Sequence, residues 1–205
     1  MIFLARFYVP LPMANIHGPR CKSCTIMDYQ QIIDKYYSSD TELRHIYMTH
    51  ARRVADLALE MSRRHPELSM NETFIEEAAM LHDIGIFLTD APGIRCYGTM
   101  PYICHGHLGA ELLRTEGLPQ HALVSERHTG TGLTVEQIRA KGWPLPLVDM
   151  RPQSLEEQVI CFADKFYSKT KHLYEARTFE QVKASMAKIS EASVERVEQW
   201  QRLFG

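Results

Sequence analysis

Hydrophobic residues recur every three to four positions along most of the chain from residue 28 onward. This spacing is the period of an amphipathic helix, in which one face packs against a core. The clearest stripe includes Leu43, Val54 and Met61, and a similar stripe ends at Phe204. Alternation with a period of two, which would indicate strands, does not extend over a useful length. The pattern therefore predicts an all-α fold.

Capping and breaking residues divide this pattern into helices. Ser39-Asp40-Thr41-Glu42 and Ser154-Leu155-Glu156-Glu157 have the form of a capping box, which satisfies free amide groups at a helix start. Gly85 and Gly117 suit helix ends. The expected helices cover approximately 28–37, 42–64, 72–85, 101–115, 119–128, 155–173 and 179–204. Residues 86–100 are expected to form a loop, and 129–153 mostly a loop with one short helical turn. We expect one bundle of about seven helices over residues 27–205.

Residues 1–26 differ from the rest of the chain. Their first half is apolar but is interrupted by Arg6 and two prolines, which is a poor fit to a signal peptide. Cys21 and Cys24 form a single Cys-x-x-Cys pair, which could be redox-active or half of a zinc site. We expect a poorly ordered extension here, and Met27 is a hypothetical natural start.

Composition narrows the function classes. The 205 residues suffice for one sizeable core, and a net charge of −2 does not indicate a nucleic-acid polymer as the partner. No apolar run approaches the roughly 20 residues of a membrane span. Five scattered cysteines favour a reducing compartment, so we expect a cytoplasmic protein. Ten histidines are the unusual feature, and they direct attention to metal binding.

Several polar residues lie on helix faces that should point toward the core. A carboxylate is rarely buried unless it is paired or bound to a metal. Asp164 follows Ala163 in a stretch that is largely apolar on both sides. A lone core histidine more often binds a backbone carbonyl, so each one alone is weak evidence. Histidine and carboxylate ligands together suit transition metals such as zinc, iron or manganese. The candidate ligands are His50, His82, Asp83, His107, His128 and Asp164.

The run Leu81-His82-Asp83-Ile84-Gly85 resembles the signature of the HD superfamily (HDIG type), whose members are metal-dependent phosphohydrolases with an all-helical core. The resemblance covers approximately residues 43–170. It implies that His50, His82, Asp83 and Asp164 hold one metal. In a two-metal branch, His107 and His128 would hold a second ion.

Two departures from the family pattern bear on activity. Ile86 stands where cyclic-dinucleotide phosphodiesterases have Lys and where one-metal 5′-nucleotidases have Glu. Thr131-Gly132-Leu133 stands where the former have Gly-Tyr-Pro. The segments His128-Thr129-Gly130 and Ala163-Asp164-Lys165 are most similar to a branch that hydrolyses dinucleoside tetraphosphates.

The resemblance predicts a metal-dependent phosphohydrolase that cleaves a phosphoester or phosphoanhydride of a small substrate, with a nucleotide or dinucleotide favoured. Asp83 would bridge two divalent transition metals, whose identity among Fe, Mn, Zn, Co and Ni stays open. Lys165, Arg53 and Arg127 could orient phosphate, and His105, expected at the pocket rim, could donate a proton.

Three alternatives remain at this point. The same ligand order is similar to that of di-iron HD-type oxygenases, which act on a polyol or organophosphonate. A regulatory domain that binds a nucleotide without turnover and a purely structural metal site are the other two. The oligomeric state is open, with a homodimer among the candidates.

Overall fold

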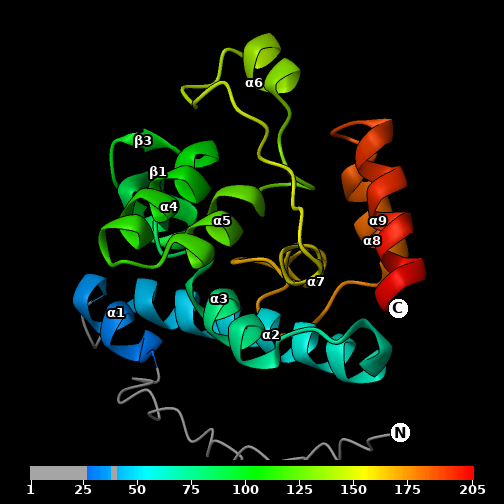
Figure 1. Cartoon of the computed structure of the whole chain (residues 1–205). Coiled ribbons are helices and arrows are strands. Elements are labelled where there is room, and N and C mark those ends of the chain that lie inside the picture. The colour runs from blue at the N-terminus through cyan, green and yellow to red at the C-terminus, as the bar shows by residue number, and fades with distance from the viewer. Residues whose placement is uncertain (1–26, 38–40) are drawn as a thin grey trace, which may run out of the picture.

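The computed structural model describes residues 27–37 and 41–205, and helices dominate this part of the chain (Figure 1). The predictions for residues 1–26, including the Cys21–Cys24 pair, lie outside the described residues. Within the described part there are nine α-helices, which confirms the all-α class. They are α1 (Tyr29–Tyr36), α2 (Glu42–Arg64), α3 (Glu72–Leu81), α4 (His105–Thr115), α5 (Pro119–Arg127), α6 (Val135–Lys141), α7 (Leu155–Asp164), α8 (Phe179–Met186) and α9 (Glu191–Phe204).

Side-chain caps define most of the helix starts. Thr41 and Asn71 accept hydrogen bonds from backbone amides three residues ahead, at the starts of α2 and α3. Ser154 does the same for α7. Full capping boxes occur at Thr134 and Thr178. There the side chain of the glutamine three residues ahead also accepts a hydrogen bond from the backbone amide of the cap residue.

The helix α7 lies at the centre of the bundle and contacts α2, α3, α5 and α9 (Figure 1). Its residues Val159 to Ala163 are fully buried, and Phe162 packs against Phe166, Trp200 and Phe204. The core therefore surrounds α7, and the last residue of this helix, Asp164, is held in a fixed position. Within the described residues, no helix has the length and apolar character needed to cross a membrane.

A small sheet occupies part of the segment that was expected to be a loop. It contains β1 (Thr89–Ala91), β2 (Cys96–Tyr97) and β3 (Met100–Pro101). The strand β1 lies in the middle, antiparallel to β2 and parallel to β3. Strands of two or three residues are too short to show a period of two, so the hydrophobic pattern could not reveal them.

Two expected helices differ most from the structure in their extent. The helix α7 stops at Asp164 instead of continuing to about residue 173, and the chain then turns back so that the Arg177 amide donates to the Phe166 carbonyl. The expected final helix is divided into α8 and α9, because Ser190 caps a new helix there. Residues 165–178 thus form a loop beside the end of α7, and this loop contributes to the site.

Candidate metal centre

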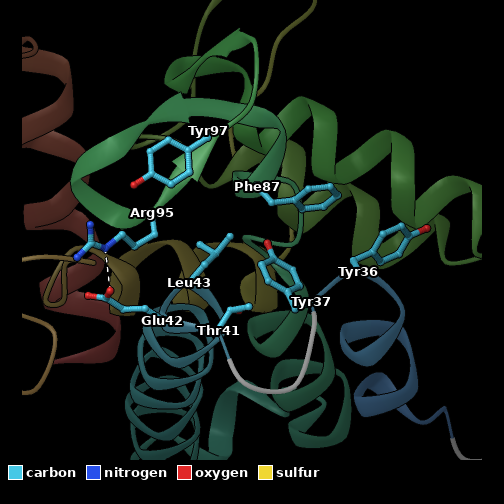
Figure 2. Close-up of a pocket in the computed structure, with 8 residues that line it drawn as sticks. All are labelled: Tyr36, Tyr37, Thr41, Glu42, Leu43, Phe87, Arg95 and Tyr97. Atoms are coloured by element: carbon cyan, nitrogen blue, oxygen red, sulfur yellow. Dashed lines mark hydrogen bonds and ion pairs between the residues drawn. The ribbon is translucent and has the colours of Figure 1, made fainter.

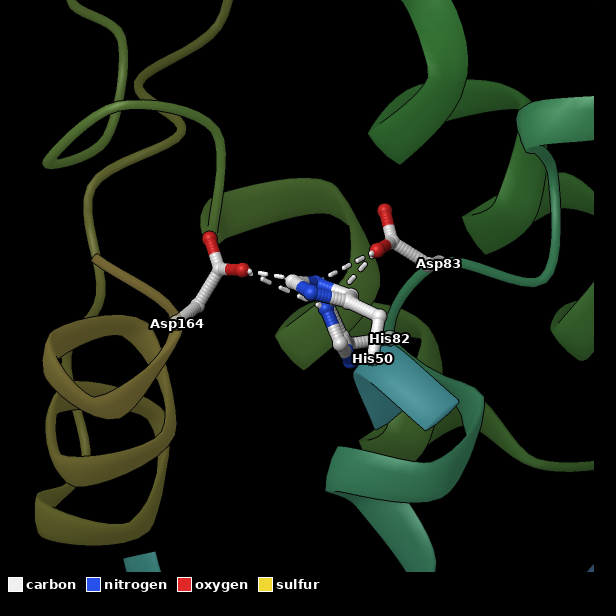
Figure 3. A group of neighbouring side chains, drawn as sticks. All are labelled: His50, His82, Asp83 and Asp164. Atoms are coloured by element: carbon white, nitrogen blue, oxygen red, sulfur yellow. Dashed lines mark ion pairs between the residues drawn. The ribbon is translucent and has the colours of Figure 1, made fainter. Parts of the chain in front are cut away.

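Three buried side chains and the partly buried Asp164, from three separate segments, meet in one cluster (Figure 3). His50 comes from the middle of α2, His82 and Asp83 follow the end of α3, and Asp164 ends α7. The Nε2 atom of His50 lies 3.2 Å from Asp83 Oδ2 and 3.0 Å from Asp164 Oδ1. His82 Nε2 lies 3.0 Å from Asp83 Oδ2 and 3.7 Å from Asp164 Oδ1. These donors surround a common point, as ligands of one ion would.

A second group adjoins the first through Asp83. The other carboxylate oxygen, Asp83 Oδ1, lies 3.5 Å from His105 Nε2 and 3.4 Å from His128 Nε2. The three side chains are buried and their ligand atoms are close enough to hold one ion. Asp83 therefore offers one oxygen to each group, which is the arrangement of a carboxylate that bridges two metals.

Backbone hydrogen bonds set the tautomer of three histidines. The Nδ1 atoms of His82, His105 and His128 lie 2.6, 2.6 and 2.7 Å from the carbonyl oxygens of the residues three positions earlier. Because Nδ1 donates to a carbonyl, Nε2 carries the lone pair in each neutral ring. His105 Nε2 and His128 Nε2 are only 3.0 Å apart, so two lone pairs face each other. A cation between the rings would turn this repulsion into attraction.

The unsatisfied atoms of the cluster also fit a metal. Both ring nitrogens of His50, Nε2 of His82 and both carboxylate oxygens of Asp83 are buried without an aligned hydrogen bond, although other side chains lie within ion-pair distance. Leaving such groups unsatisfied costs about 1–3 kcal/mol each. Nitrogen and carboxylate donors in this ratio suit a divalent transition metal. The residues present therefore fit one ion at each group.

Electrostatics within the cluster point the same way. Burial opposes the charged form of Asp83 and Asp164, but His82 and Lys169 beside Asp83, and Lys165 beside Asp164, hold both carboxyl pKa values well below normal. Burial likewise opposes charge on His82, yet these carboxylates raise its pKa to about 9. The site thus holds two ionised carboxylates, which is the form in which a carboxylate binds a metal.

The two histidines of the second ligand group are neutral. Burial and the neighbouring His128 lower the pKa of His105 to about 3, and burial lowers the pKa of His128. A neutral imidazole with a free Nε2 is the form that binds a metal.

A cleft opens beside the cluster, and several positively charged side chains line it. Its volume is about 260 Å³, and its lining includes His50 and Asp164. Lys165 Nζ lies 2.7 Å from Asp164 Oδ2 and also donates to the His128 carbonyl, at 3.0 Å. Lys169 Nζ lies 2.5 Å from Asp83 Oδ2, and Arg177 lines the same cleft. Positive groups that line a cleft favour an anionic ligand.

The predicted site residues divide into those that the structure brings together and those that it does not. His50, His82, Asp83, His128 and Asp164 meet at the cluster, with Lys165 beside them. His107 does not join them, because its Nδ1 faces Glu126 at 3.1 Å. His105, which was expected at the rim, takes the position expected for His107. Two residues advance about 200° around a helix, so only one of this pair can face inward.

Two arginines are also placed away from the cleft. Arg53 is exposed and lines a separate surface depression with Met48 and Thr49. Three residues from His50 leave it about 60° around α2, far enough to reach the solvent-facing flank. Arg127 instead binds Glu157, with Nη1 3.1 and 3.0 Å from the two carboxylate oxygens. Neither arginine is in a position to orient a phosphate in the cleft.

Lys169 and Arg177 are site residues that sequence reasoning missed. Both follow the end of α7: Lys169 lies in a segment that was expected to be helical as far as residue 173, and Arg177 lies in the expected connection after it. A helical pattern indicates which face a residue occupies, but it gives no such information about a loop.

A larger cavity of about 440 Å³ lies elsewhere, lined by aromatic rings that include Tyr36, Phe87 and Tyr97 (Figure 2). Its Glu42 and Arg95 side chains pair with each other at 2.8 Å. The lining contains no member of the histidine–aspartate cluster, so the smaller cleft is the better candidate site.

Comparison with known protein families decides the classification. The HD-domain family model matches residues 47–168, more than half of the chain and all the clustered ligands. This chain belongs to the HD-domain family. Family membership and the clustered His and Asp side chains support a metal-dependent hydrolase in general terms.

Similar curated proteins give less information about activity. An uncharacterized protein of Methanocaldococcus jannaschii is 34% identical over 58% of this chain and 62% of its own length. A tRNA (cytidine(56)-2'-O)-methyltransferase of Thermoplasma volcanium is 27% identical over 84% of this chain and 48% of its own length. The corresponding Picrophilus torridus protein is 29% identical over 74% of this chain and 39% of its own length. The chain thus spans about two fifths to three fifths of these relatives. No solved structure matches it significantly.

Proposed function

We propose that this protein is a metal-dependent phosphohydrolase that cleaves a phosphoester or phosphoanhydride of a small molecule, with a nucleotide or dinucleotide as the favoured substrate. The observation that carries the proposal is the pair of adjoining ligand groups that share Asp83 and open into a cationic cleft. The metal ligands would be His50, His82, Asp83 and Asp164 on one side, and Asp83, His105 and His128 on the other.

Each part of the site has a distinct task in this mechanism. Divalent metals held by these residues would supply a water of lowered pKa and would neutralise charge on phosphoryl oxygens. Asp83 holds both groups in register with its two oxygens. Lys165 fixes the orientation of Asp164 through its 2.7 Å contact, while Lys169 and Arg177 attract and orient the phosphate.

The cationic lining also bears on the oxygenase alternative. A di-iron oxygenase of this family could use the same ligand set, so the cluster alone does not separate the two activities. A neutral polyol gains little from Lys169 and Arg177, whereas a phosphorylated substrate gains charge-assisted hydrogen bonds from both. The cleft therefore favours an anionic substrate and, of the oxygenase substrates, only an organophosphonate.

The relatives named as tRNA methyltransferases do not extend that reaction to this chain. The chain spans less than half of their length, and the family model that matches this chain is that of the HD domain. We propose hydrolysis by this domain and no methyl transfer. A small phosphorylated molecule stays the proposed partner.

A metal-supplemented hydrolysis screen tests the proposal. Purified protein would be assayed with Mn²⁺, Fe²⁺, Co²⁺, Ni²⁺ and Zn²⁺ against nucleotides, dinucleotides and simple phosphoesters. We expect phosphate release with at least one metal, and loss of at least roughly 100-fold in kcat/KM for Asp83→Asn, because one charge and the bridging function disappear. The matched control is Asp56→Asn, an exposed aspartate of α2 that lies outside both ligand groups.

Two results would contradict this function. Iron in protein purified without added metal, together with oxygen consumption on an organophosphonate, would establish the oxygenase instead. Bound metal without turnover on any phosphorylated compound would favour a regulatory or structural role.

A further inference from the structure

The cleft at the metal centre continues into a second cavity. This neighbouring cavity has a volume of about 280 Å³ and is lined by Ala91, Gly93 and Ile94 from the small sheet region. It shares Tyr102, Ser168 and Lys169 with the cleft. Ligand sites usually measure roughly 300–1,000 Å³, so each cavity is suited to one part of a ligand.

The cleft next to the cluster has the character of a phosphate site. Among the described residues, no carboxylate lies within ion-pair distance of Arg177, whereas Lys165 and Lys169 each contact an aspartate of the cluster. The Nε atom of Arg177 is buried without a hydrogen-bond partner, and Nη1 reaches only Ser185 Oγ, at 3.5 Å. A buried guanidinium N–H without an acceptor is suited to a ligand oxygen.

The neighbouring cavity has a different character. Ala91 and Ile94 present apolar side chains to it, and the ring of Tyr102 lies at the boundary between the two cavities. Tyr102 stacks on His105, with ring centroids 4.5 Å apart, so the cluster holds this ring in place. A fixed aromatic ring beside aliphatic groups is suited to an organic group with a flat apolar face.

We propose that the combined cleft recognises an organic phosphate in two parts. The phosphate lies beside Lys169 and Arg177, and the organic group lies against Tyr102 in the neighbouring cavity. Arg177 is then the specificity residue for the phosphate. This inference rests on the proposed hydrolase function and narrows its substrates to phosphate compounds with a small organic group.

Binding of two unreactive probes tests the proposal without requiring turnover. Titration calorimetry on the full chain with Mn²⁺ would compare inorganic phosphate, which fills the cleft alone, with phenylphosphonate, which occupies both cavities. We expect Arg177→Gln to weaken both probes roughly 10- to 100-fold, because a charge-assisted hydrogen bond is lost. Arg202→Gln, at an exposed arginine of α9 that lines neither cavity, is the control and leaves both affinities unchanged.

A second variant tests the neighbouring cavity, where the organic group is proposed to bind. A Cβ atom on Gly93 would meet no other atom within 4 Å, so a larger side chain can be introduced without a clash. Gly93→Leu should weaken phenylphosphonate several-fold and leave inorganic phosphate unchanged. Thermal unfolding would verify that each variant is folded. If Arg177→Gln does not fold, Arg177→Lys keeps the charge without the guanidinium fork and should bind phosphate more weakly than the wild type.

The outcomes separate this inference from the proposed function. Unchanged phosphate affinity in the Arg177 variants, or equal effects of Gly93→Leu on both probes, would overturn the two-part cleft even if the protein hydrolyses phosphoesters. The expected binding pattern without turnover in the screen would instead support the cleft and contradict the hydrolase.

Discussion

His105 and His107 occupy the first turn of α4 and face different surroundings. His105 is buried, and its Nδ1 lies 2.6 Å from the Tyr102 carbonyl, which directs Nε2 toward Asp83 and His128. His107 is partly exposed, and it pairs with Glu126 at 3.1 Å. The two side chains therefore form a matched pair, with one in the cluster and one outside it.

This geometry predicts different metal contents for two alanine variants. His105→Ala removes one of three ligands of the second group, so we expect the purified protein to hold one ion instead of two. His107→Ala removes only a partly exposed contact to Glu126, which Arg114 also binds, and should cost no more than about 1 kcal/mol. Elemental analysis against protein concentration, with urea unfolding for stability, checks both. Loss of metal in His107→Ala would show that the cluster rearranges around this residue.

At the scale of single residues, hydrophobic periodicity indicated which side chains face the core inside helices. It gave no such information about residues beyond the helix ends. His50 and Asp164 stood on apolar stripes, and the structure brings them to the cluster with His82, Asp83 and His128. The sequence analysis placed His107 at the metal and His105 at the rim, whereas the packing of α4 turns His105 toward Asp83 and His107 toward Glu126.

At the scale of the elements, glycines allow α4 to approach the turn that carries Asp83. A Cβ atom on Gly85 would lie 2.4 Å from the Gly109 amide nitrogen and 2.6 Å from the His105 carbonyl oxygen. Both neighbours are backbone atoms, so neither can move aside without a shift of α4. Ser125 of α5 reinforces this junction, since its hydroxyl lies 2.7 Å from the His82 carbonyl and 3.0 Å from the Gly106 carbonyl.

Gly85→Ala should consequently disturb both stability and metal binding. We expect it to lower the free energy of unfolding by at least about 1–3 kcal/mol, the usual cost of overpacking. Because the turn carries Asp83, the affinity for metal should fall as well. Gly93→Ala, where the new Cβ meets open space, should stay within about 0.5 kcal/mol of the wild type. Urea unfolding of both variants is the measurement, and equal stabilities would contradict close packing at Gly85.

Capping residues and prolines predicted where helices begin better than the sequence predicted the path of the segments between them. Asn71, Ser154 and Thr178 cap helices as their residue types indicated, and Pro119 begins α5. The early end of α7 carries no comparably strong local signal, and the Ser190 cap that separates α8 from α9 lies within a continuous apolar pattern. Tertiary contacts of the 165–178 loop, such as the Arg177 amide to the Phe166 carbonyl, determine the path there.

On the scale of the whole molecule, the cluster joins segments that are far apart in sequence. Its side chains come from α2, the turn after α3, α4, the end of α5 and α7. The core around α7 positions these elements, but the buried carboxylates and facing imidazoles oppose their convergence. Bound metal would remove that opposition and connect all five segments.

Metal removal should therefore destabilise the entire domain. A ligand that binds only the folded state stabilises it by about 4 kcal/mol when its free concentration is 1,000 times the Kd. Each kcal/mol shifts Tm by about 2–4 °C in a domain of this size, so we expect chelation to lower Tm by roughly 8–16 °C. Differential scanning calorimetry with saturating metal and with chelator measures the shift. Asp83→Asn, which removes a charge shared by both groups, should show only a small difference between the two conditions. Equal Tm values for metal-loaded and chelated wild-type protein, with metal content verified in each sample, would mean that the cluster does not bind metal as part of the folded core.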